Sequence, residues 1–141
     1  MAPARGLLDT STVILLGRID PGILPAQPFI SAVTLAELSV GPLVAKTEVD
    51  RAERMAHLRQ AEMDSDPLPF DADAARAFGL VAAALREMGR KPAARAFDAM
   101  IAATAIANDL PLYTCNPADF PQISGLTVMA IPHPDHEPPA R

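Results

Sequence analysis

Short apolar runs alternate along this chain with longer stretches in which apolar residues recur at helical spacing. The short runs predict four buried strands, at residues 6–9, 29–30, 111–114 and 127–131, with a further extended piece at 67–70. The longer stretches predict five helices, at residues 13–16, 31–40, 47–63, 71–88 and 94–108. Strands that alternate with helices imply an α/β fold, in which helices cover both faces of a mainly parallel sheet.

Glycine and proline mark where the elements are expected to end. Residues 20–28 contain three prolines and a glycine and predict a loop. Gly41 followed by Pro42 predicts the end of the second helix, because proline does not continue a helix easily. The chain shows no repeat and no linker, so residues 1–131 are expected to form one domain. Residues 132–141 are rich in proline and charge and predict a disordered tail.

Composition indicates the redox environment of the protein and limits the ways in which it can bind nucleic acid. The chain of 141 residues has one cysteine, Cys115, which excludes an internal disulfide and fits a reducing cytoplasm. No secretory signal is visible, and no apolar run approaches the ~18 residues that span a membrane. The net charge of −5 argues against binding nucleic acid by phosphate neutralisation alone. An RNA substrate would therefore need local positive charge and a bound metal.

Two aspartates occupy positions where a carboxylate is costly or unusual. Asp98 lies in a helix that is apolar around most of its circumference, so its desolvation needs a cation or several donors. The structural alternative is an ion pair with Arg95, three residues earlier. Asp9 ends an apolar strand, where the alternative is a helix N-cap.

Two further acids can each be explained by a purely structural role when they are considered one at a time. Glu37 follows Thr34 at capping-box spacing, and Asp119 follows a turn-forming Asn116-Pro117 pair. Taken together, however, acids at a strand end, early in the next helix and on a buried helix can converge at one edge of a parallel sheet. Two carboxylates ~5 Å apart repel by about 3 kcal/mol at an effective dielectric of 20. Such a group favours Mg²⁺ or Mn²⁺, and this chemistry indicates phosphodiester hydrolysis.

Other kinds of site have weaker support. His57 lies on a charged helix and is expected to be solvated, and His133 and His136 lack a third zinc ligand. The chain contains no glycine-rich phosphate loop, and neither Ser11 nor Ser31 has a nearby histidine to activate it.

Four segments resemble, in order, the signature segments of PIN domains of the VapC type: residues 7–11, 31–38, 97–105 and 114–120. The resemblance implies a three-layer α/β/α sandwich and a metal-dependent endoribonuclease that acts as a toxin on RNA. It also implies Mg²⁺, or alternatively Mn²⁺, as cofactor, neutralisation by a VapB-type antitoxin, and a homodimer. We expect the dimer contact on the apolar helix faces between Gly41 and Met63.

The resemblance also implies roles for individual residues. Asp9 and Asp98 resemble the direct metal ligands, and Glu37 resembles the third acid, which holds the metal or its water. Ser11 is similar to the hydroxyl that orients the first aspartate. Many PIN domains carry an acid where Asn116 stands, and here Asp119 alone supplies charge in that segment. We therefore expect one strongly bound metal rather than two.

RNA is expected to lie near a basic cluster before the Asp98 helix, formed by Arg86, Arg90, Lys91 and Arg95; the structural alternative is a solvated helix end. Two other functions are kept open. One is a catalytically weak PIN-like scaffold that binds RNA or a protein partner, which the asparagine at position 116 favours. The other is a phosphatase with Asp9 as nucleophile, which is disfavoured because Ser11 stands where a second acid is usual.

Overall fold

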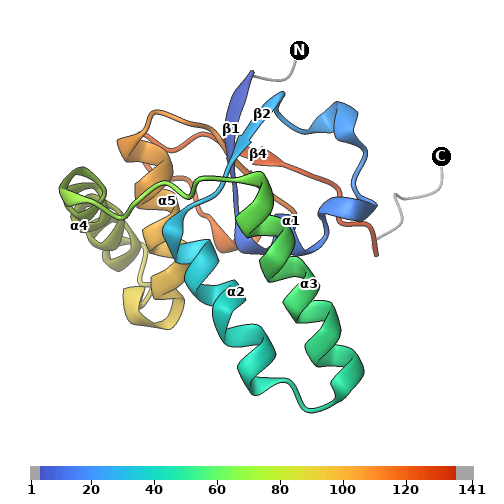
Figure 1. Cartoon of the computed structure of the whole chain (residues 1–141). Helices are drawn as coiled ribbons and strands as arrows, with labels where there is room; N and C mark the ends of the chain where they lie inside the picture. The colour runs from blue at the N-terminus through green and yellow to red at the C-terminus, as the bar shows by residue number, and fades with distance from the viewer. Residues whose placement is uncertain (1–3, 136–141) are drawn as a thin grey trace.

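The computed structural model describes residues 4–135, which form three layers around a parallel sheet (Figure 1). The strand order is β2-β1-β3-β4, and all three pairings are parallel. The strands are β1 (Arg5–Leu8), β2 (Gln27–Phe29), β3 (Leu112–Thr114) and β4 (Val128–Ala130). Parallel pairing places the carboxyl ends of all four strands at the same edge of the sheet.

Within residues 4–135, five α-helices and four short 3₁₀ turns connect the strands. The helices are α1 (Thr10–Ile14), α2 (Ala32–Val44), α3 (Glu48–Asp64), α4 (Ala72–Glu87) and α5 (Ala96–Ala107). The 3₁₀ turns are Leu16–Arg18, Pro21–Ile23, Pro92–Arg95 and Pro117–Asp119. In Figure 1, α2 and α3 form a hairpin that extends away from the sheet, while α4 lies beside α5.

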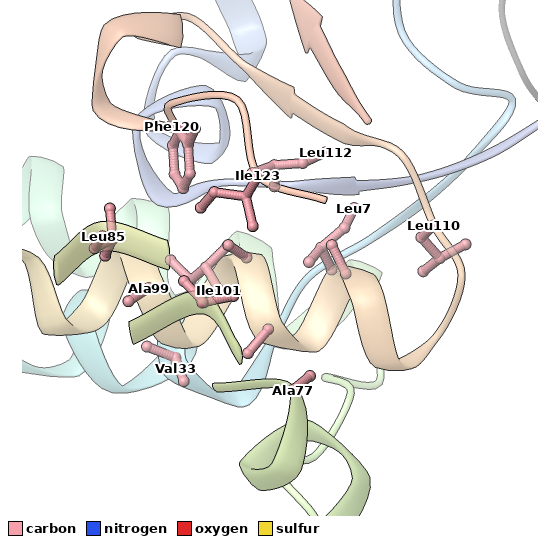
Figure 2. Packing of buried hydrophobic residues seen from close by; sticks show 14 residues of the cluster. Leu7, Val33, Ala77, Leu85, Ala99, Ile101, Leu110, Leu112, Phe120 and Ile123 are labelled. Atoms are coloured by element: carbon pink, nitrogen blue, oxygen red, sulfur yellow. The ribbon is translucent and has the colours of Figure 1, made fainter. Parts of the chain in front are cut away.

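The core lies on both faces of the sheet because consecutive strand side chains point to opposite sides. Leu7 and Leu112 belong to the larger cluster with α4 and α5, where Figure 2 shows them near Ile101. Their neighbours Leu8 and Tyr113 belong to a second cluster on the other face, beside the segment that follows α1. Leu7 and Leu112 thus pack on the α5 side of the sheet, and Leu8 and Tyr113 pack on the side of the segment that follows α1.

The predicted strands and helices are confirmed, with bounds that differ by a few residues at most ends, and so is the parallel sheet. The first helix is an exception, because it begins at Thr10 rather than at Val13. Asp9 is its N-cap and accepts a hydrogen bond from the Thr12 amide, so the hydroxyl residues at 10–12 lie inside the helix. The predicted loop at 20–28 also contains the Pro21–Ile23 turn and the start of β2.

The predicted end of the second helix at Gly41–Pro42 is wrong, since α2 continues to Val44 with a buried Pro42 inside it. The same turn of α2 is packed against α3. The Arg54 side chain packs over Gly41, where a Cβ would lie 3.3 Å from its Cδ, and its Nη1 donates to the Gly41 carbonyl at 3.0 Å. The expected pair of helices between Gly41 and Met63 is therefore the last turn of α2 followed by α3.

The segment after β4 is described as far as Asp135, which forms an ion pair with Arg18. The remaining residues of the predicted tail, 136–141 with His136 among them, lie outside the described residues, as do residues 1–3. Within the described residues, no helix is long and apolar enough to cross a membrane.

Gly6 in β1 is required by the close approach of Tyr113 from β3. A Cβ at position 6 would lie 2.6 Å from Tyr113 Cε1, and Tyr113 is itself 1% exposed. We predict that Gly6→Ala lowers the free energy of unfolding by about 1–3 kcal/mol, because the buried ring has no room to move away. Denaturant unfolding measures this change.

Gly17→Ala is the matched control, since an added Cβ at position 17 meets no atom within 4 Å. It should change the free energy of unfolding by less than about 0.5 kcal/mol. Equal effects of the two substitutions would show that the Gly6–Tyr113 contact does not constrain the sheet.

Candidate metal centre

Asp9 lies at the carboxyl end of β1 and is held in place by four donor groups. Its Oδ1 accepts from the Thr12 amide at 3.0 Å and from the Thr12 hydroxyl at 2.6 Å, while its Oδ2 accepts from the Thr114 hydroxyl at 2.6 Å. The Ser11 hydroxyl lies 3.0 Å from both carboxylate oxygens. Asp9 is 4% exposed, so these bonds offset the cost of burying its carboxylate and fix its orientation.

Ser11 makes the most readily exchanged of these bonds. Its single proton is shared between two oxygens, and a carboxylate has about four lone-pair positions for its partners. A ligand that approaches Asp9 would therefore replace the Ser11 hydroxyl before the shorter bonds from Thr12 and Thr114. The alternative role of Asp9 as a helix N-cap is confirmed. The same arrangement leaves the Ser11 hydroxyl as the hydrogen-bond donor that a ligand could replace.

Glu37 points from α2 toward α1 rather than back along its own helix. Its Oε1 accepts from the Thr10 hydroxyl at 2.7 Å, and Thr10 Oγ1 lies 3.1 Å from Thr34 Oγ1. The N-cap of α2 is Ser31, whose Oγ accepts from the Thr34 amide at 3.0 Å. The capping box that Thr34 and Glu37 predicted is therefore wrong, and the Glu37 carboxylate is directed by a residue of another helix.

Asp98 lies in the first turn of α5, with its side chain 28% exposed. Its pKa is raised from 3.8 to about 6, chiefly by burial and further by the negative charges of Asp119, Glu37 and Asp9. Arg95 acts in the opposite direction and lowers this pKa. Three acids from separate parts of the chain are thus close enough to act electrostatically on the Asp98 carboxylate at one edge of the sheet.

Arg95 carries the positive charge nearest to these acids. Its Nη1 lies 2.5 Å from Asp119 Oδ1 and 3.7 Å from Asp98 Oδ2. The predicted ion pair between Arg95 and Asp98 is present as the longer contact, and Asp119 is the closer partner.

A family model for the PIN domain matches residues 7–126, a span that contains all four acids. The chain belongs to the PIN domain family, in its VapC branch. It is 40% identical over 132 residues to Ribonuclease VapC5 of Mycobacterium tuberculosis, which covers 92% of this chain and 95% of that protein. It is also 29% identical over 133 residues to Ribonuclease VapC of Rickettsia bellii, covering 92% of this chain and 98% of the relative.

Solved structures have the same arrangement of elements as this PIN domain. A crystal structure of VapBC-5 from M. tuberculosis, a member of the VapBC family of toxin-antitoxin systems, matches with a TM-score of 0.80 and 36% identity. That match covers 92% of this chain and all of the other. VapBC2 from Rickettsia felis, bound to a promoter DNA fragment, matches with a TM-score of 0.69 over 89% of this chain and 98% of the other, and its 20% identity shows the fold alone.

The donor set of this PIN domain fits a hard divalent cation held by few protein ligands. In the part of the chain that the structure describes, no three His, Cys, Asp or Glu side chains converge closely enough to enclose a metal. Mg²⁺ does not require such an enclosure, because it keeps several waters and binds through one or two carboxylates. The pKa of Asp98 is raised chiefly by burial and further by the charges of three acids, and a cation at this edge would favour the ionised carboxylate against both effects.

Asn116 is linked to Asp9 through its backbone. It precedes the Pro117–Asp119 turn, and among the described residues its amide side chain makes no recorded hydrogen bond. Its backbone N–H donates instead to Thr114 Oγ1 at 2.9 Å, and that hydroxyl donates to Asp9. The sequence interpretation missed Thr12 and Thr114, although hydroxyl residues beside a strand-end acid are the available signal.

A cleft beside the acids is lined by three of the four predicted basic residues. Arg90, Lys91 and Arg95 line it together with Asp98 and Asp119, over an apolar floor. Arg86 is exposed on α4 and is not among its lining residues. The cleft therefore places positive and negative groups side by side.

His57 lies in a different hollow, between the α2–α3 hairpin and α1, which Glu37 and Thr10 also line. It is half-buried there rather than fully solvated as expected. The acidic residues Asp50 and Glu53 line the same hollow.

The pKa of Asp98 generates a prediction for the stability of the metal-free protein. The native state keeps a proton on Asp98 up to about pH 6, whereas the unfolded chain loses it near pH 4, so native stability falls as the pH rises through this window. Asp98→Asn removes the charge that causes this loss. In buffer with chelator, we predict that the variant is more stable than the wild type by about 1–2 kcal/mol at pH 7.5, after allowing for solvent screening, and no more stable at pH 4.

Asp73→Asn is the control, because Asp73 also pairs with an arginine three residues away but on the exposed surface of α4. It should give no gain in stability that grows with pH in urea unfolding. A gain for Asp98→Asn that did not change between pH 4 and pH 7.5 would contradict the electrostatic description of the centre.

Proposed function

We propose that this PIN domain is an endoribonuclease toxin of the VapC type, which hydrolyses RNA phosphodiester bonds with a divalent cation and is neutralised by a VapB-type antitoxin. The observation that carries the proposal is the raised pKa of Asp98 in an edge where three further carboxylates act on it. The match to the PIN family and to ribonucleases named VapC supports hydrolysis of RNA as the reaction.

Asp9 and Asp98 are the proposed metal ligands, and Glu37 is the third acid, which holds the metal or water near it. Mg²⁺ is the proposed ion, with Mn²⁺ as a substitute, because both favour oxygen donors. When bound, such an ion neutralises charge on the phosphate and assists the attack of water. Asn116 supplies a neutral amide where many PIN domains have an acid, and a neutral oxygen is a weaker ligand for a hard cation, which supports one strongly held ion rather than two.

The surrounding hydroxyl residues have a positioning role in this proposal. Thr12 and Thr114 hold Asp9 through hydrogen bonds of 2.6 Å, and Thr10 holds Glu37 at 2.7 Å. The Ser11 hydroxyl shares its proton between both Asp9 oxygens, so one of these oxygens can bind a ligand while the other keeps its bond to Ser11. Oriented carboxylates need no rearrangement of their own when the substrate arrives, which favours catalysis.

RNA is proposed to lie along the cleft that Arg90, Lys91 and Arg95 line, so that its backbone passes next to Asp98 and Asp119. The net charge of the chain is −5, so these local cations must supply the attraction to phosphate. Arg86 is exposed nearby on α4 and is proposed to contact a more distant phosphate.

The proposed protein partners are a VapB-type antitoxin and a second copy of the chain. Relatives of known structure occur in toxin-antitoxin complexes, which supports the antitoxin. The hairpin of α2 and α3 exposes five large apolar side chains, which supports a dimer contact there: Val40 at 52%, Leu43 at 83%, Val44 at 59%, Val49 at 72% and Met63 at 81%. A toxin that cuts cellular RNA acts in the cytoplasm, which is the location we propose.

A cleavage assay on a set of structured RNAs tests the proposed reaction. We predict cutting by the wild type with Mg²⁺, none with chelator, and a decrease of more than about 100-fold for Asp98→Asn, because a ligand carboxylate is lost. Asp73→Asn removes an exposed carboxylate of α4 and should cut as the wild type does.

The outcomes of this assay separate the two functions that the sequence leaves open. Cutting that persists with chelator, or in Asp98→Asn, would overturn the metal-dependent reaction. A wild type that cuts none of the RNAs with Mg²⁺ or Mn²⁺ would overturn the nuclease and favour a PIN-like scaffold.

A further inference from the structure

Arg95 occupies a position in which its own helix gains nothing from an arginine. It is the N-cap of α5, with φ −132° and ψ 42°, and its side chain makes no capping hydrogen bond. Short acceptor side chains such as Ser, Thr, Asp and Asn are preferred at this position. A cation at the N-terminus also opposes the helix dipole. The reason for a guanidinium here must therefore lie outside the helix.

The contacts of Arg95 identify that reason as the acidic cluster. Its Nη1 lies 2.5 Å from Asp119 and 3.7 Å from Asp98, and the Arg95 side chain is 59% exposed. Arg90 and Lys91 line the same cleft, but among the described residues neither forms an ion pair with these two acids. Arg95 is thus the cation that offsets repulsion in the cluster while no metal is bound.

We propose that Arg95 is a removable counter-ion: it neutralises Asp98 and Asp119 in the metal-free protein and is released to the RNA backbone when a divalent cation binds. This inference rests on the proposed function and adds that the binding of the metal and the binding of RNA are coupled. A divalent cation at Asp98 would repel the guanidinium, and the two positive groups compete for the same carboxylate.

The surroundings of Arg95 allow this release without a change in the fold. The side chain is exposed and follows the short Pro92–Arg95 turn, so rotation about its own bonds is sufficient to break the ion pairs. The cleft beside it is also lined by Arg90 and Lys91, so the released Arg95 and these two residues could contact the same RNA backbone. Because one event then frees a cation for RNA, metal and RNA must each strengthen the binding of the other.

Titration calorimetry with Mn²⁺ alone tests the first half of the inference. Arg95→Gln should bind Mn²⁺ about three- to tenfold more tightly than the wild type, because the competing cation is lost. Arg95→Lys keeps the charge and should stay near the wild-type affinity. Arg76→Gln is the matched control, since Arg76 also pairs with an aspartate three residues away, on the exposed face of α4, and should leave Mn²⁺ affinity unchanged.

Fluorescence anisotropy with a single-stranded 2′-O-methyl oligonucleotide, which resists cleavage, tests the second half. Mn²⁺ should tighten binding to the wild type, and Arg95→Gln should lose most of this enhancement. The double variant Arg90→Ala, Lys91→Ala should bind the oligonucleotide more weakly but keep wild-type Mn²⁺ affinity, because these residues do not pair with the acids. Thermal unfolding confirms that each variant is folded.

The outcomes distinguish this inference from the proposed function. Mn²⁺ binding that is unchanged or weaker in Arg95→Gln, in a wild type that does bind Mn²⁺, overturns the counter-ion. An enhancement by Mn²⁺ that survives in Arg95→Gln overturns the release to RNA. A wild type and Arg95→Gln that both fail to bind Mn²⁺ overturn the metal-dependent function itself, and the counter-ion with it.

Discussion

Repulsion among four carboxylates at the carboxyl edge of the sheet is the interaction that the rest of this structure accommodates. Two ionised carboxylates ~5 Å apart repel by about 3 kcal/mol at an effective dielectric of 20, so such a group needs compensation in the absence of a metal. The chain supplies hydroxyl donors to Asp9, Thr10 to Glu37, and Arg95 to Asp98 and Asp119. The compensation at Asp98 is incomplete, because burial and the charges of the other acids together raise its pKa to about 6 despite Arg95.

The parallel sheet is what brings these groups to one place. β1 and β3 are neighbours, so the residues that end them meet although they are about a hundred positions apart, as the bond from Thr114 to Asp9 shows. α5 packs closely against α4, and its small residues Ala99 and Ala102 share one core cluster with Leu7 and Leu112 of the sheet. Asp98, beside Ala99 in the first turn of α5, lies where the charges of the other acids act on its carboxylate.

The sequence was sufficient to predict the sheet, the helices and the approach of the four acids, because strand-end positions and helix periodicity are local properties. It was insufficient where a side chain takes its partner from another element. Glu37 has the spacing of a capping box but bonds to Thr10 of α1. Pro42 has the appearance of a helix stop but lies buried inside α2, next to Gly41, whose carbonyl accepts from Arg54 of α3. Arg95 could be recognised as a basic residue, yet its two acidic partners include Asp119, which is close only after folding.

Anomalous diffraction from crystals grown with Mn²⁺ tests most directly whether these acids hold a hard cation. We expect a peak within coordinating distance of the Asp9 and Asp98 carboxylates, at the carboxyl ends of β1 and β3, with Arg95 turned away from Asp98. Ordered crystals without a peak at these carboxylates, with Arg95 still paired to both acids, would contradict this expectation.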